Sequence, residues 1–141
     1  IAELAGVGPG HHVLKVGTRW GGMAREQYDL ARERVAASGV GQLVDVQLCD
    51  YRDLRRRFDR IVSIEMFEAV GEEHWPTFFA ACDGLLVPGG HMVMQPITMP
   101  HRRYLASRRS HGWIHEYIFP GGLIPPRRRS MPPPRGGRRC G

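Results

Sequence analysis

The chain has 141 residues, a length that suits one domain, with 42% hydrophobic and 24% charged residues, as in ordinary globular proteins. Lys and Arg exceed Asp and Glu by 20 to 14. No apolar run approaches the roughly 20 residues that a membrane span needs, and the three cysteines show no metal-ligand spacing, so we expect no metal and a reducing, cytoplasmic location. The chain starts at Ile1 without a leader pattern, which suggests a fragment.

Hydrophobic patterns predict alternating strands and helices along the first part of the chain. Val13–Val16 reads as a strand that ends in a glycine-rich turn at residues 17–22. The predicted order of later elements is a helix at 23–38, strands at 43–48 and 58–64, a helix at 72–86, a strand at 91–97 and a weaker helix at 102–109. This alternation predicts an α/β fold with a parallel sheet and flanking helices.

The last part of the sequence differs in composition from the rest. Residues 125–141 contain six arginines and no acidic residue. Such a Pro/Arg/Gly segment cannot bury enough apolar surface to fold, so we expect a domain at 1–124 and a disordered basic segment at 125–141. A basic segment could bind nucleic acid or anionic lipid, but it lacks the interleaved aromatic residues of single-strand binders. Nucleic acid is therefore an improbable partner.

Three features could carry chemistry. The turn that opens at Gly17 could bring backbone N–H groups close to an anionic ligand, or it could be a plain tight turn. Asp50 follows a predicted strand and could bind an adenine or ribose group, although a capping role is the more ordinary interpretation. Glu65 and Glu68 follow an apolar strand, where burial would perturb a carboxylate, whereas on a surface turn both would be solvated.

Several segments together resemble one known family. The resemblance rests on the order of the glycine turn and four further segments, which read Asp-Tyr-Arg-Asp at 50–53, Phe-Glu-Ala-Val-Gly at 67–71, Leu-Val-Pro-Gly-Gly at 86–90 and Tyr-Ile-Phe-Pro-Gly-Gly at 117–122. The chain is identified by them as a member of the cyclopropane-fatty-acyl-phospholipid synthase family, which includes the mycolic acid cyclopropane synthases. The resemblance implies a Rossmann-like class I methyltransferase fold.

The resemblance also implies a reaction. The family transfers a methyl group from S-adenosylmethionine to the double bond of an unsaturated acyl chain of a phospholipid, and a bound bicarbonate takes the proton as the cyclopropane ring closes. It implies an enzyme peripheral to the inner membrane face. The positions that match the family's bicarbonate site are Glu68, Gln95, Ile97 and Thr18. The positions that match its donor site are Gly17, Gly21, Gln27, Asp50 and Tyr51.

The chain departs from the family pattern in three places. Thr18 and Arg19 replace a Cys and a Gly of the donor turn, and a side chain at Arg19 would crowd the donor. About 15 to 20 residues of the family pattern are missing near Met23–Ala24, and the resemblance stops near Ile124. The sequence therefore leaves three interpretations: an active lipid methyltransferase, an inactive degenerate fragment of that family, or a basic-tail binding protein. It predicts weak donor binding.

Overall fold

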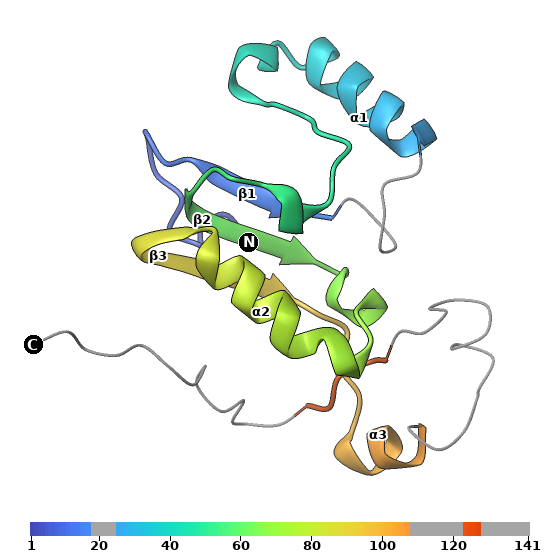
Figure 1. Cartoon of the computed structure of the whole chain (residues 1–141). Helices are drawn as coiled ribbons and strands as arrows, with labels where there is room; N and C mark the ends of the chain where they lie inside the picture. The colour runs from blue at the N-terminus through green and yellow to red at the C-terminus, as the bar shows by residue number, and fades with distance from the viewer. Residues whose placement is uncertain (18–24, 108–122, 128–141) are drawn as a thin grey trace, which may run out of the picture.

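The sheet of this protein is parallel and has three strands in the described part of the chain. The structure is a computed structural model and describes residues 1–17, 25–107 and 123–127. Strands β1 (Val13–Val16), β2 (Phe58–Ile64) and β3 (Leu86–Gln95) lie in the order β1-β2-β3 (Figure 1). The predicted α/β fold with a parallel sheet is confirmed.

The register of the strands places their carboxyl ends at one edge of the sheet. Val16 pairs with Ser63, and Ile64 pairs with Gln95. The central strand β2 is the most buried of the three, with its residues 61–63 buried. In a parallel sheet, ligands bind beyond the carboxyl ends of the strands. Any site of this fold is therefore built from the segments that follow Val16, Ile64 and Gln95.

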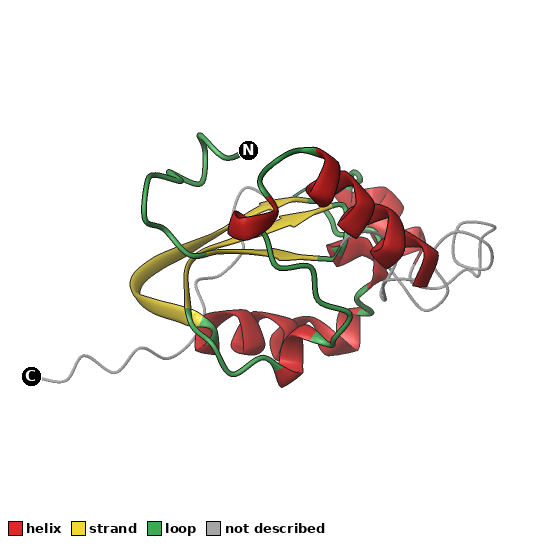
Figure 2. Ribbon diagram, turned by 90° about the horizontal axis from the view of Figure 1, so that it is seen from above, coloured by secondary structure: helices red, strands yellow, loops and turns green. Residues whose placement is uncertain are grey.

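Helix α2 (Trp75–Gly84) covers one face of the sheet. A short 3₁₀ turn at Glu72–His74 leads into it, and Pro76 stands in its first turn, where a missing N–H costs nothing. Phe78 is fully buried and forms the centre of an aromatic cluster with Phe67 and Phe79, whose ring centroids lie 5.4 Å apart. The other face of the sheet meets the N-terminal segment (Figure 2), where Arg60 donates a 2.8 Å hydrogen bond to the carbonyl of Ala5.

Helix α1 (Arg25–Ala37) confirms the helix predicted at 23–38, although residues 23 and 24 lie outside the described residues. The helix has no buried residue, and its Leu30 is 45% exposed. Figure 1 shows α1 beyond the edge of the sheet that β1 forms. The helix therefore gains little stability from tertiary packing.

The strand predicted at 43–48 is wrong. Gly41–Leu43 forms a 3₁₀ turn, Leu43 is 78% exposed, and residues 44–48 run as an extended loop. An alternating pattern can become a strand only where a neighbouring strand supplies hydrogen bonds. This segment pairs with no strand of the described part of the chain, so its alternating pattern does not result in a strand.

The start of β3 also differs from the prediction. The strand begins at Leu86 instead of His91, because Leu86 already pairs with Phe58, and an irregularity in the register follows before His91 pairs with Arg60. Helix α3 (His101–Ser107) matches the helix predicted at 102–109, of which residues 108 and 109 lie outside the described residues. None of the helices that the structure describes is both long and apolar enough to cross a membrane.

Residues 123–127 return to the folded body. The amide of Arg127 donates to the carbonyl of Met99 at 2.8 Å, and the amide of Met99 donates to the carbonyl of Pro125 at 3.0 Å. Residues 128–141 lie outside the described residues, so the predicted disordered segment and its boundary at residue 124 remain predictions.

Candidate functional site

The carboxyl end of β1 continues directly into the predicted donor turn. Gly17 adopts a φ of +74°, a conformation that residues with a side chain rarely adopt. A Cβ at this position would lie 2.6 Å from Cγ of Met66, so the backbone approach leaves no room for a methyl group. Gly17 is thus required for a close approach between β1 and the turn after β2. Thr18 and Gly21 lie outside the described residues.

Glu68 lies in the 3₁₀ turn Phe67–Ala69 after β2 and is 0% exposed. Its Oε1 accepts a hydrogen bond from the amide of Ile97, and its backbone carbonyl accepts one from the amide of Leu123 at 3.0 Å. Its Oε2 is buried and has no partner in the described part of the chain. A buried carboxylate oxygen without a partner is costly, so this atom is set up to accept a hydrogen bond from a ligand.

Gln95 is the last residue of β3, and Ile97 follows the strand, which was predicted to continue to residue 97. The carbonyl of Gln95 accepts a 2.9 Å hydrogen bond from the amide of Glu65. Gln95 is exposed at the sheet edge, and Ile97 is 42% exposed. Because the amide of Ile97 already donates to Glu68, it orients that carboxylate. The structure therefore brings Glu68 and Ile97 together directly, and Gln95 to the same edge.

Glu65 shows a feature that the sequence analysis missed. Its φ is +47°, and it is the one residue other than glycine in the described part of the chain with a positive φ. Such a conformation costs energy in a residue with a side chain. The strain lies where the chain turns from β2 into the buried segment Met66–Glu68, as is common next to functional sites.

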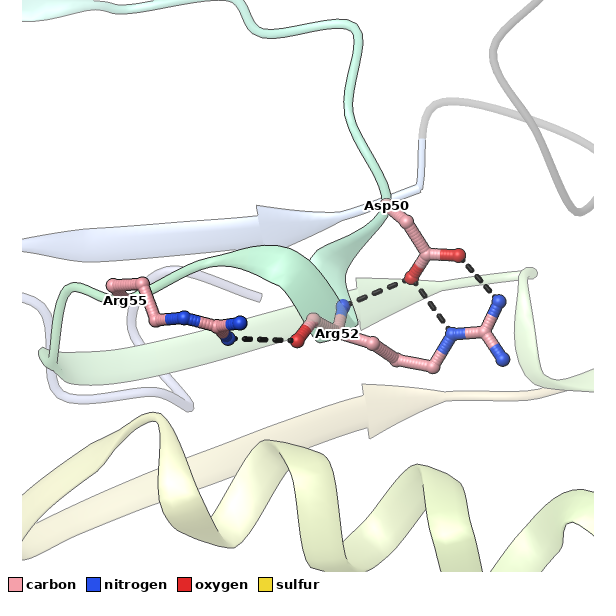
Figure 3. A network of polar contacts seen from close by, with 3 residues as sticks. All are labelled: Asp50, Arg52 and Arg55. Carbon is pink, nitrogen blue, oxygen red and sulfur yellow. Dashed lines mark hydrogen bonds and ion pairs between the residues drawn. The ribbon is translucent and has the colours of Figure 1, made fainter.

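Asp50 and Tyr51, the predicted adenine-side pair, lie next to each other where a 3₁₀ turn begins, and their role toward a donor stays a prediction. Asp50 caps the 3₁₀ turn Tyr51–Asp53 and accepts 2.9 Å hydrogen bonds from the amide and from Nε of Arg52 (Figure 3). The Arg52 guanidinium holds the pKa of Asp50 below its usual range. Arg55 in turn donates to the carbonyl of Arg52 at 3.4 Å.

Tyr51 packs into the core instead of facing a ligand site freely. Its ring meets Phe78 edge to face at 5.7 Å, and burial raises the pKa of its hydroxyl. Asp50 therefore has the capping role, and its adenine-binding role stays a prediction. An Asp followed two residues later by an Arg was the sequence signal for the capping role.

Gln27 lies in the first turns of α1, which follow the donor turn in the chain. Its Oε1 is buried and has no partner among the described residues. An amide oxygen in this state can accept a hydrogen bond from a ligand.

Lys15, the only lysine of the chain, was also missed. It lies on β1, and its Nζ donates a 2.6 Å hydrogen bond to the carbonyl of Gly17. Burial lowers the pKa of its ammonium group.

A hollow of about 380 Å³ lies away from these residues, between α1 and the loop that follows it. It is lined by Tyr28, Arg32, Val35, Ala36, Gly41, Val44, Asp45 and Val46. None of the predicted site residues lines this hollow, so the candidate site is the edge formed by Gly17, Glu68 and Gln95.

Comparison with solved structures defines the class of the fold. The chain superimposes on mycolic acid cyclopropane synthase CmaA1, solved with SAH and CTAB, with a TM-score of 0.70 and 28% identity over 88% of this chain and 54% of that one. The cyclopropane synthase MmaA2 from Mycobacterium tuberculosis shares the fold with a TM-score of 0.55. The fold is that of the class I methyltransferases that use S-adenosylmethionine.

The sequence defines the family more closely. The family described as mycolic acid cyclopropane synthetase matches residues 1–131, and the chain belongs to this family. The tuberculostearic acid methyltransferase UfaA1 of Mycobacterium tuberculosis is 49% identical over 89% of this chain and 33% of its own length. The cyclopropane-fatty-acyl-phospholipid synthase of Escherichia coli K12 is 36% identical over 89% of this chain and 35% of its own length.

The chain spans about a third of the length of these two relatives. The alignment with UfaA1 has 141 positions but uses only 89% of a chain of 141 residues. Some positions of the relative therefore have no counterpart here, in agreement with a chain shorter than the family pattern. The place of the gap near Met23–Ala24 remains a prediction.

Proposed function

We propose that the site at the carboxyl ends of β1, β2 and β3 serves a methyl transfer from S-adenosylmethionine to the double bond of an unsaturated phospholipid acyl chain, giving a cyclopropane ring. The observation that carries the proposal is the buried carboxylate of Glu68, which has one oxygen held by Ile97 and the other without a partner in the described residues. Family membership supports the class of reaction.

The described residues offer a partial fit for the donor. Gly17 carries the chain from β1 into the donor turn with a positive φ, and Gln27 has a buried amide oxygen that can accept a hydrogen bond. S-adenosylmethionine, when bound, supplies a methyl group activated by the sulfonium charge. Asp50 does not fit as a free carboxylate for this ligand, because Arg52 already occupies it.

Glu68 fits a small acid such as bicarbonate. Its free Oε2 is an acceptor that a bicarbonate O–H would satisfy, and the hydrogen bond from Ile97 keeps the carboxylate from rotating. Ring closure requires the loss of a proton in a place that excludes water, and Glu68 is fully buried. In this proposal Glu68 orients the proton acceptor. It does not take the proton itself.

A second candidate function is supported by other observations. Helix α1 buries none of its residues, and Asp50 is bound by its own neighbour Arg52. These features fit an inactive fragment of the family that keeps the fold but binds the donor weakly. The third interpretation, binding through the basic segment, stays a prediction, because residues 128–141 lie outside the described residues.

The test uses vesicles of a phospholipid with a monounsaturated acyl chain, incubated with the full chain, S-adenosylmethionine and bicarbonate. Lipid mass spectrometry should show the gain of one methylene with the unchanged chain and with Glu73→Gln, an exposed control. Glu68→Gln should abolish the product. Absence of product from a chain that binds S-adenosylhomocysteine would refute the proposal and favour the inactive fragment.

A further inference from the structure

The ammonium group of Lys15 is a cationic group that the structure holds next to the start of the candidate donor turn. Lys15 stands on β1 opposite Val62 in register, two residues before the strand gives way to the turn. Its Nζ folds forward along the strand and donates a 2.6 Å hydrogen bond to the carbonyl of Gly17. The charge is thereby held at the carboxyl end of β1, where the ligands of this fold bind.

No carboxylate of the described residues neutralises this charge. The ion pairs of the described part of the chain involve Arg25, Arg52 and His74, and none includes Lys15. The residues outside the description that follow Gly17, at 18–24, contain no acidic side chain either. Lys15 itself is exposed at the surface, and partial desolvation lowers the pKa of its ammonium group.

An ammonium group has three N–H donors, and the Gly17 carbonyl uses one of them. No described residue accepts a hydrogen bond from the remaining donors, so they can bind an anionic oxygen. In S-adenosylmethionine and its demethylated form, the anionic group is the carboxylate of the amino-acid part. A carboxylate would supply the negative charge that the surroundings of Lys15 lack.

We propose that Lys15 is a ligand-binding residue that recognises the carboxylate of the donor's amino-acid part, an inference that rests on the proposed function. The hydrogen bond to Gly17 fixes the ammonium group at the turn, and this positioning gives the site a preference for adenosine thioethers with an amino-acid carboxylate over those without one. Lys15 thus adds a charged contact at the carboxyl end of β1.

The experiment measures dissociation constants of the full chain by calorimetry for two probes. S-adenosylhomocysteine carries the carboxylate, and 5′-methylthioadenosine has the same nucleoside and sulfur but lacks the amino-acid part. Lys15→Met should weaken the binding of S-adenosylhomocysteine by about threefold to tenfold, the range of a partly exposed charged hydrogen bond. Its binding of 5′-methylthioadenosine should stay within about twofold, which also shows that the variant is folded.

Two further variants sharpen the test. Lys15→Arg keeps the charge and should recover most of the lost affinity. Arg102→Met removes a cation from the exposed surface of α3 and should change neither constant. An equal loss of affinity for both probes, or no loss for S-adenosylhomocysteine, would overturn the role of Lys15 but not the proposed donor site. Failure of the unchanged chain to bind either probe would instead overturn both this role and the proposed donor site.

Discussion

Replacement of Gly17 by Ala tests the close approach on which the site depends. The new Cβ would lie 2.6 Å from Cγ and 3.1 Å from Cβ of Met66, and Met66 is itself buried. Two terms follow. A φ of +74° costs a residue with a side chain about 1–2 kcal/mol, and forcing a methyl group into a packed contact costs about 1–3 kcal/mol. We expect Gly17→Ala to lower the free energy of unfolding by about 2–5 kcal/mol.

A second glycine separates the two terms. Gly39 has the same φ of +74°, but a Cβ there would meet nothing within 4 Å. Gly39→Ala therefore has the cost of the positive φ but not the cost of a close contact. Urea unfolding of both variants should give a difference of about 1–3 kcal/mol between them, which is the energy of the contact with Met66.

Met66→Ala provides a check on the origin of that difference. It removes the Cγ at 2.6 Å and leaves only the Cβ at 3.1 Å. In this background the cost of Gly17→Ala should fall to within about 1 kcal/mol of the cost of Gly39→Ala. Equal effects of Gly17→Ala and Gly39→Ala in the unchanged chain would refute the reasoning, since they would mean that β1 and the turn after β2 do not meet closely.

Two further predictions concern the neighbouring turns. Glu65→Gly should raise the free energy of unfolding by about 0.5–1 kcal/mol, since glycine relieves the positive φ of +47° at some cost in unfolded-chain entropy; a loss of stability in thermal unfolding would contradict it. The depressed pKa of Asp50 means that its pairing with Arg52 stabilises the fold above the ordinary carboxyl pKa and is lost as the pH falls through the folded-state pKa. Asp50→Asn should remove that part of the acid dependence of unfolding, and an unchanged pH profile would show that the pair contributes nothing.

The parts of the fold that depend on local pattern were predictable from the sequence. The run Phe58–Ile64 is apolar enough to predict the central strand. The segment that ends before Pro88 has a helical pattern, and it forms α2, which covers the sheet. The segment at 43–48 has an equally good alternating pattern but forms no strand. The two segments differ in their surroundings. A strand needs a neighbouring strand to pair with, and the sequence pattern of one segment does not show whether such a strand is present.

The sequence predicted the parts of the candidate site that lie in a recognisable motif. It did not predict which groups the side chains bind. Glu68 was found from its place after an apolar strand, and its burial agrees with a role in a site. Asp50 was assigned to a ligand, yet the nearest cation, Arg52, binds it. Lys15 was missed, because a lysine on a short strand predicts a solvated side chain, and only the structure shows its hydrogen bond to Gly17.

The single turn at Phe67–Ala69 joins the segments that build the site. The side chain of Glu68 holds the chain after β3 through Ile97, its backbone holds Leu123, and the preceding Met66 packs on Gly17 after β1. A substitution that removes the Glu68 side chain would therefore leave a cavity and an unpaired Ile97 amide, and loss of activity would say little about chemistry. Glu68→Gln keeps an acceptor for that amide and fills the same volume. It replaces only the oxygen that has no partner in the described residues, which is the atom that the proposed reaction needs.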